Sequence, residues 1–311
     1  MPAILPHIFV FFSLNNNRPC FVKKQKFVKL ESIEKGNMLT IPMKNKHGGN
    51  MISDWELART NLARLQSRHI EVAVLPIGAT EPHNRHLPYG QDFLHTTEVG
   101  RRCVRDAWLA TQKVILLPSI PYGVDCNLMD FPFAMHIRQS TLEALVDDLV
   151  RSLRHFGIRK IVILNGHGGN EFKGLIRQLQ CDYDVHLFLI NWWQVGSDQY
   201  DHIFDRPDDH AGELETSVAM YLYPQLVESE KAGSGASKKF RFEALNQGWV
   251  KTSRNFGKLN DHCAVGSPIM ASAEKGETYL NLVCTRITRF LVELANSPID
   301  ETFPYAPGDP K

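Results

Sequence analysis

The sequence lacks any cysteine pair that would predict a disulfide framework or a cysteine metal site. No two of its six cysteines are close enough to form a CxxC motif. Scattered cysteines in a chain of this size are typical of reduced, mostly buried thiols. The pattern therefore predicts a cytoplasmic protein.

The sequence also lacks an excess of charge of either sign. Its 35 basic and 34 acidic residues give a formal net charge of +1. A protein that recruits nucleic acid or an anionic membrane usually carries a clear basic patch, and no basic stripe with interleaved aromatic residues is present. We therefore expect neither a nucleic acid nor a membrane as partner.

The apolar stretch near the N-terminus is too short to cross a bilayer. It runs from Ala3 to Leu14, and Pro6 and His7 interrupt it. It also lacks the preceding positive charge and the small-residue cleavage site of a secretory signal. We interpret residues 1–50 as a poorly ordered extension, or as the result of a start codon assigned too early.

The remaining composition is that of a globular protein. Hydrophobic residues make up 43% of the sequence and charged residues 22%, which are ordinary values for this class. A chain of 311 residues is long enough to bury a sizeable core. We expect a single domain over residues 51–300, followed by a C-terminal tail at residues 301–311.

From Met51 onward, strand-like apolar runs alternate with helical patterns. Strands are expected at residues 70–77, 113–117, 160–164 and 185–190, and helices at 93–108, 140–156, 171–179, 211–222 and 273–295. This alternation predicts an α/β fold, with a mostly parallel sheet flanked by helices on both faces. In such sheets, ligands bind at the carboxyl ends of the strands.

Residues 229–268 form a long stretch of weak periodicity. A loop of this length in a compact domain is usually functional or mobile. Together with Trp192 and Trp193, which follow a predicted strand, it is a candidate cover for a bound substrate. For the two tryptophans, packing in the core or between subunits is the alternative.

The first candidate site cluster follows the apolar run at residues 72–77. Glu81 and His83 can point to the same side, because alternate residues of an extended segment share a face. Asp92 comes nine residues after His83, and a carboxylate can bridge two divalent ions. The alternative is that Glu81 and His83 are solvated loop residues and that Asp92 caps the next helix.

The second cluster is Asn-Gly-His-Gly-Gly-Asn at residues 165–170, with His167 at its centre. Glycines allow the backbone to approach a ligand closely. The segment matches neither G-x-x-x-x-G-K-[ST] nor G-x-G-x-x-G, the phosphate-binding patterns. This favours a metal-ligating histidine over a phosphate-binding turn, with a structural histidine as the alternative.

The third cluster contains His210 and Glu213, three residues apart at the start of a predicted helix. This spacing would place the two side chains on one helix face. Asp208 and Asp209 precede them, where acidic residues interact favourably with the helix dipole. Helix capping explains Asp209 but leaves the histidine and glutamate unexplained.

Together, three motifs make the sequence resemble the creatininase (creatinine amidohydrolase) family. They are Pro76–His83 with Asp92, the turn at Asn165–Asn170 and the segment His210–Ser217. The resemblance extends from about Asp54 to about Leu294. It implies a creatininase-like α/β fold. It also implies a homo-oligomeric hydrolase of a small-molecule substrate, with a hexamer as one option, that binds two divalent metal ions per subunit.

The resemblance also implies how the metal ions are held. Asp92 is expected to bridge the two ions, Glu81 and His167 to complete one site, and His83 to belong to the other. Mixed histidine and carboxylate shells suit Zn, Mn or Fe.

One expected ligand departs from creatininase proper. That protein has a carboxylate where this chain has Gly169, so Glu213 is expected to replace it beside His83. The departure argues against creatinine itself as the substrate.

These expectations favour hydrolysis of a non-peptide C–N bond, in a cyclic amide or a formamide, by a metal-activated water. His210 and Glu215 are the expected catalytic residues: His210 as proton donor to the leaving nitrogen, and Glu215, or Asn170, as a group that orients the ligands. Two alternatives remain. One is hydrolysis of a lactone or a ring ketone in a sugar-like substrate, and the other is a non-catalytic, metal-stabilised binding protein.

Overall fold

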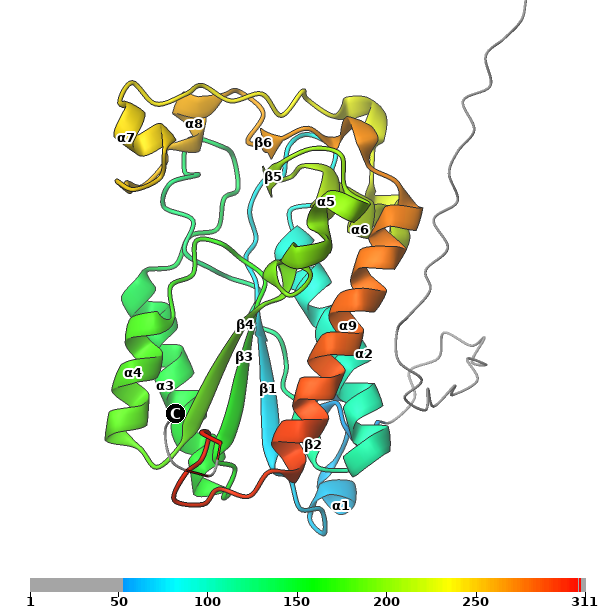
Figure 1. Ribbon diagram of the computed structural model, residues 1–311, viewed down its shortest axis with the longest axis vertical. Coiled ribbons are helices and arrows are strands. Elements are labelled where there is room, and N and C mark those ends of the chain that lie inside the picture. Colours follow the sequence, from blue (N-terminus) through cyan, green and yellow to red (C-terminus); the bar gives the residue numbers. More distant parts are fainter. Residues whose placement is uncertain (1–52, 307, 309–311) are drawn as a thin grey trace, which may run out of the picture. The chain divides into compact units, whose positions relative to one another are not determined.

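The computed structural model describes residues 53–306 and residue 308 (Figure 1). Its strands are β1 (Val72–Ile77), β2 (Val114–Leu116), β3 (Lys160–Asn165), β4 (His186–Asn191), β5 (Asp208–His210) and β6 (Val265–Gly266). Its α-helices are α1 (Leu62–Leu65), α2 (Gln91–Thr111), α3 (Gln139–His155), α4 (Lys173–Asp182), α5 (Tyr200–Ile203), α6 (Glu213–Leu222), α7 (Glu243–Asn246), α8 (Phe256–Leu259) and α9 (Ala273–Asn296). Short 3-10 helices occupy Leu57–Arg59, Trp192–Gln194, Ser197–Gln199, Pro224–Leu226, Ser229–Lys231 and Pro268–Met270. The predicted extension at residues 1–50 lies outside the described residues.

Four strands form a sheet in the order β2-β1-β3-β4. All three pairings are parallel, and β1 pairs along its whole length with β3. Parallel neighbours need a crossover between them, and helices supply these crossovers, as in other α/β proteins. The predicted parallel sheet with flanking helices is confirmed.

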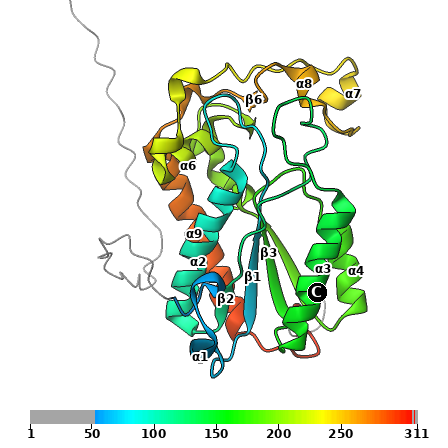
Figure 2. The ribbon, with the colours of Figure 1, turned by 180° about the vertical axis from the view of Figure 1, so that it is seen from behind.

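Alternate residues of β1 enter two separate apolar cores. Val72 and Val74 pack with residues of α2, α6 and α9, while Ala73, Leu75 and Ile77 pack with residues of α3 and α4. In Figure 2 the two helix groups lie on opposite sides of the sheet. Every residue of β1 and β3 is buried, which explains why these strands are nearly continuous apolar runs.

The predicted helix at residues 211–222 starts two residues later than expected, and this difference affects the site. Asp208–His210 forms β5, which pairs antiparallel with β6. Ala211 then adopts a positive φ of 55°, and α6 begins at Glu213. The helical spacing assumed for His210 and Glu213 therefore does not apply.

The weakly periodic segment at residues 229–268 contains α7, α8 and β6. Figure 1 shows this segment, in yellow to orange, beyond the carboxyl ends of the parallel strands. It is therefore on the side of the sheet where ligands bind in α/β proteins. None of the helices described by the structure is long and apolar enough to cross a membrane.

Candidate metal centre

Five of the predicted site residues meet at the carboxyl edge of the sheet. They come from the loop after β1, the first turn of α2, the loop after β3 and the end of β5. All five are buried, namely Glu81, His83, Asp92, His167 and His210. The structure thus brings together residues that are far apart in the sequence.

Two glycines allow the first turn of α2 to approach the strand ends. A Cβ atom at Gly78, directly after β1, would lie 2.4 Å from the backbone nitrogen of Phe93. A Cβ atom at Gly166, directly after β3, would lie 2.8 Å from the carbonyl oxygen of Asp92. Larger residues at these two positions would push α2 away, so the glycines place the Asp92 carboxylate between the two strand ends.

Asp92 lies between two imidazoles. Its Oδ1 is 3.0 Å from His83 Nε2, and its Oδ2 is 3.0 Å from His167 Nδ1. Glu81 Oε1 lies 3.2 Å from the same His167 nitrogen and 3.8 Å from His83 Nε2. One carboxylate oxygen thus faces each histidine, which is the arrangement of a carboxylate that bridges two cations.

The backbone fixes the tautomer of each histidine. His83 Nδ1 lies 3.2 Å from the carbonyl oxygen of Glu81, and His167 Nε2 lies 3.2 Å from that of Val124. His210 Nε2 lies 3.0 Å from the carbonyl oxygen of Pro82. Because a carbonyl oxygen only accepts a hydrogen bond, each of these outer nitrogens carries the proton. The inner nitrogen of each neutral ring therefore presents a lone pair to the cluster, as metal-ligating imidazoles do.

Glu215, and not Glu213, reaches this cluster. Glu215 Oε1 lies 3.8 Å from His83 Nε2, and its Oε2 accepts a hydrogen bond of 2.6 Å from the backbone N–H of Ala211. His83, Asp92 and Glu215 form one group of converging donor atoms. Glu215 was expected to orient ligands, but its carboxylate occupies the ligand position expected for Glu213.

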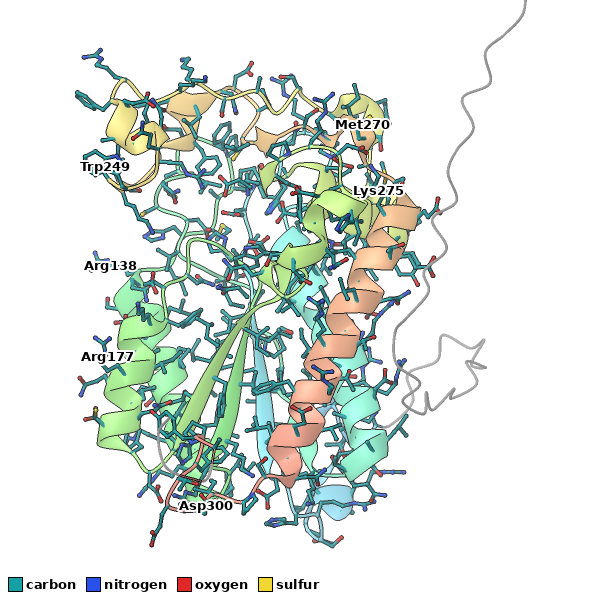
Figure 3. The ribbon with its side chains drawn as sticks, viewed as in Figure 1. Arg138, Arg177, Trp249, Met270, Lys275 and Asp300 are labelled. Carbon is teal, nitrogen blue, oxygen red and sulfur yellow. The ribbon has the colours of Figure 1, made fainter. Side chains whose placement is uncertain are left out.

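The prediction that Glu213 completes the metal site is corrected by its contacts. Its carboxylate accepts hydrogen bonds from the backbone N–H groups of Asp205 and Arg206 and pairs with Lys275. Lys275, labelled at the start of α9 in Figure 3, also donates to the carbonyl oxygen of Met270 at 2.9 Å. Residues two apart on a helix point to different sides, so Glu215 faces the cluster while Glu213 faces α9.

Asp125 is a site residue that the sequence analysis missed. It is fully buried, and its Oδ1 lies 2.9 Å from His167 Nε2. It stands in the loop between β2 and α3, at the same edge of the sheet as the other site residues. An acidic residue soon after a predicted strand was the available signal, but it belongs to none of the three motifs.

Several buried polar atoms of the cluster lack a hydrogen-bond partner among the described residues. They are Glu81 Oε2, His83 Nε2, Asp92 Oδ2 and both carboxylate oxygens of Asp125. Burying a carboxylate costs free energy unless it is paired or coordinates a metal. The donor set of carboxylates and imidazole lone pairs therefore fits divalent cations.

The pKa values of the cluster reflect its mutual charges. Burial raises the pKa of Glu81 to about 7, against the opposing charge of His167. Burial likewise raises the pKa of Glu215 to about 8, against the opposing charge of His83. Burial disfavours the charged form of His83, but the Asp92, Glu215 and Glu81 carboxylates outweigh it and raise its pKa to about 10. Burial and the neighbouring charges thus shift the pKa of all three groups upward.

A cavity of about 480 Å³ opens onto this centre. Its lining includes Glu81, Asp92, His167, His210 and Glu215, together with Trp193, Arg254 and Phe256. Residues of the 229–268 segment thus form part of the cavity wall. The two tryptophans have different surroundings. Trp193 lines the cavity, whereas Trp192 is buried in the core beside His95, with 5.3 Å between the ring centroids.

The chain matches the family model named creatininase and described as creatinine amidohydrolase, over residues 55–291. It is 30% identical over 230 residues to the mycofactocin precursor peptide peptidase of Mycobacterium ulcerans (strain Agy99). That alignment covers 71% of this chain and 84% of the relative.

Solved structures agree with this match. A Bacteroides fragilis NCTC 9343 protein, described as a candidate creatinine amidohydrolase, has a TM-score of 0.75 and 36% identity, over 80% of this chain and 99% of that chain. A structure described as the Mn form of creatininase has a TM-score of 0.65 and 22% identity, over 78% of this chain and 99% of that chain. The second likeness concerns the fold alone, and both agree with the α/β architecture described above.

Proposed function

Because the chain belongs to the creatininase (creatinine amidohydrolase) family, we propose that it is a metal-dependent hydrolase that cleaves an amide-type C–N bond at this centre. The leading candidate substrate is a cyclic amide or a formamide, in which the cleaved C–N bond is not a peptide bond. The observation that carries the proposal is the position of Asp92, with one carboxylate oxygen 3.0 Å from His83 and the other 3.0 Å from His167.

The proposed centre holds two divalent ions, Zn, Mn or Fe, on two overlapping ligand sets. Glu81, Asp92 and His167 form one set, and His83, Asp92 and Glu215 form the other, so that Asp92 is shared. When bound, the ions would polarise a substrate carbonyl and lower the pKa of a water molecule to about 7. The Mn form of creatininase is consistent with manganese as one choice.

His210 is the proposed proton donor to the leaving nitrogen. It lines the cavity, and its ring centroid lies 4.3 Å from that of His83. Burial and the nearby His83 hold its pKa well below the usual value, so the ring is neutral. Its Nε2–H donates a hydrogen bond to the carbonyl oxygen of Pro82. Nδ1 is therefore the nitrogen that can accept a proton and pass it on.

Apolar side chains limit the water around the reacting group. Leu128, Leu214 and Phe256 line the same cavity as the carboxylates, and all three are buried. The Phe256 ring contacts the His210 ring at 5.0 Å between centroids. The His210 ring therefore packs between His83 and Phe256. The apolar contact also excludes solvent, which strengthens electrostatic interactions in the cavity.

A peptide-derived amide is the second candidate substrate. The relative from Mycobacterium ulcerans is named a precursor peptide peptidase. A cavity of about 480 Å³ is within the size range of small-molecule sites and would accept one end of a peptide. A lactone or a ring ketone of a sugar-like substrate remains an alternative at the same centre.

Metal analysis combined with a substrate screen tests the proposal. The purified chain is expected to hold two ions per subunit and to hydrolyse at least one member of a panel of cyclic amides, formamides, short peptides and lactones. A fully metallated protein that hydrolyses none of them would instead support a non-catalytic, metal-stabilised binding protein.

We further propose that the protein is a cytoplasmic homo-oligomer, with a hexamer as one option. The edge strand β4 is only partly buried along most of its length, and Leu189 and Phe290 line an apolar groove beside it. Exposed sheet edges are usually covered, so a second copy is a reasonable occupant. Sedimentation velocity of the purified protein tests the oligomeric state.

A further inference from the structure

Asp125 is held against the outer edge of His167 by a rigid loop. The backbone N–H of Val124 donates to Asn170 Oδ1 at 3.1 Å, and that of Asp125 donates to His136 Nδ1 at 3.1 Å. The carbonyl oxygen of Gly123 accepts from the N–H of Ile137 at 2.9 Å. These contacts fix the backbone that carries Asp125.

The missing side chain at Gly169 makes this approach possible. A Cβ atom at Gly169 would lie 2.3 Å from His167 Nε2 and 2.5 Å from the carbonyl oxygen of Val124. The same position that lacks a carboxylate ligand therefore leaves room for the loop that carries Asp125.

The two nitrogens of His167 face different carboxylates. Nδ1 lies 3.0 Å from Asp92 Oδ2 and 3.2 Å from Glu81 Oε1. Nε2 lies 2.9 Å from Asp125 Oδ1 and 3.2 Å from the carbonyl oxygen of Val124. Since the two ring nitrogens point in divergent directions, a cation on Nδ1 would be on the opposite edge of the ring from Asp125.

We propose that Asp125 is a positioning residue whose negative charge, 2.9 Å from His167 Nε2, supports the Val124 carbonyl in keeping the proton of His167 on Nε2 and the lone pair on Nδ1, and so tunes the affinity of the ion bound by Glu81, Asp92 and His167. The inference rests on the proposed metal centre. A carboxylate beside the outer N–H of a ligating histidine fixes the tautomer and makes the ring a better donor.

The position of Asp125 also balances charge. Glu81, Asp92, Asp125 and Glu215 are four acidic side chains around one centre, and two divalent cations carry the matching positive charge. Asp125 also forms a group of converging donor atoms with Glu81 and His167, so the experiment must separate a role through His167 from direct coordination. Asp92, in contrast, faces both inner nitrogens.

The test compares full-length wild-type protein with the Asp125→Asn variant and the matched control Asp130→Asn. Asp130 lies in the same loop but is exposed. Each metal-stripped protein is titrated with Mn²⁺ by calorimetry, and the ions per subunit at saturation are counted by mass spectrometry. For Asp125→Asn we expect one of the two dissociation constants to rise about 10- to 100-fold, with two ions still bound at saturation.

A double variant shows whether the effect passes through His167. In a His167→Ala background, Asp125→Asn should not change the dissociation constant of the remaining ion. An additional effect of similar size there would contradict the positioning role. Thermal unfolding of each metal-free variant checks that the protein is folded, and Asp125→Ser replaces the asparagine variant if that one does not fold.

The other outcomes separate the two proposals. Loss of one ion from Asp125→Asn at saturating Mn²⁺ would make Asp125 a direct ligand and overturn the positioning role. Unchanged dissociation constants in a variant that binds two ions would overturn it as well, and would leave the metal centre intact. A wild-type protein that binds no Mn²⁺, Zn²⁺ or Fe²⁺ would overturn both.

Discussion

Glu213 and Glu215 stand two residues apart on α6, yet their carboxylates face opposite surroundings. Glu215 lies 3.8 Å from His83 in the candidate centre, whereas Glu213 pairs with Lys275 of α9. The two residues have the same side chain and belong to the same helical turn. They therefore provide a matched pair for separating metal binding from fold stability.

The substitution Glu215→Gln is expected to weaken the binding of one of the two ions, because a neutral amide is a poorer ligand than a carboxylate. Glu213→Gln is expected to keep both ions and to lower the free energy of unfolding by ~2 kcal/mol, through weaker hydrogen bonds in a charged pair. Metal counts and urea unfolding measure the two effects. If Glu213→Gln instead loses an ion and Glu215→Gln only loses stability, Glu213 is the ligand.

Removal of metal is expected to destabilise the protein. The buried carboxylates that lack hydrogen-bond partners would lose their cations, and a ligand that binds only the folded state stabilises it by about 4 kcal/mol at 1,000 times its dissociation constant. Calorimetry with and without a chelator should show a lower unfolding temperature in the chelated sample. An unfolding temperature that changes neither with chelator nor with added Mn²⁺ or Zn²⁺ would argue against a resident metal.

The substitution His210→Ala is expected to lower kcat by about 100- to 10,000-fold, the range for losing a general acid or base. The ligands of both proposed ions remain, so metal content should be unchanged. His202→Ala, an exposed histidine on α5, is the control and should keep wild-type activity. If His210→Ala loses metal along with activity, His210 acts as a ligand and not as the proton donor.

The substitution Gly169→Ala is expected to disrupt the His167 side of the centre. The added Cβ atom would lie 2.3 Å from His167 Nε2, so the imidazole must shift from its position in the centre. Gly168→Ala is the neighbouring control, since nothing lies within 4 Å of its added Cβ atom. We expect lower metal affinity for Gly169→Ala alone, and equal affinities of the two variants would rule out the steric argument.

The contact between α6 and α9 depends on Gly276. A Cβ atom there would lie 2.0 Å from the carbonyl oxygen of Ser217, so Gly276→Ala is expected to lower the free energy of unfolding by about 1–3 kcal/mol. Gly174→Ala, on α4, meets nothing within 4 Å and is expected to be neutral or slightly stabilising. Denaturant unfolding of both variants gives the comparison.

Much of the fold could be predicted from the sequence, because the core strands are buried on both faces. Val72–Ile77 and Lys160–Asn165 are short apolar runs, and runs of this kind predict parallel strands wherever helical patterns separate them. The placement of Glu81, His83 and His167 followed from the same rule, since each comes just after a strand.

The errors at Glu213 and Asp125 have physical causes that the sequence does not display. The positive φ of Ala211 and the pairing of β5 with β6 delay the start of α6, and spacing alone could not show either feature. Asp125 reaches His167 through a loop fixed by Asn170 and His136, which are tertiary contacts.

The two proposed ligand sets have an order along the chain. Glu81, Asp92 and His167 precede α4, whereas the set of His83 and Asp92 is completed only by Glu215, in the first turn of α6. During synthesis, a nascent chain that ends after β3 already contains the first set but not the second. The second proposed set could therefore form only after α6 has left the ribosome and docked.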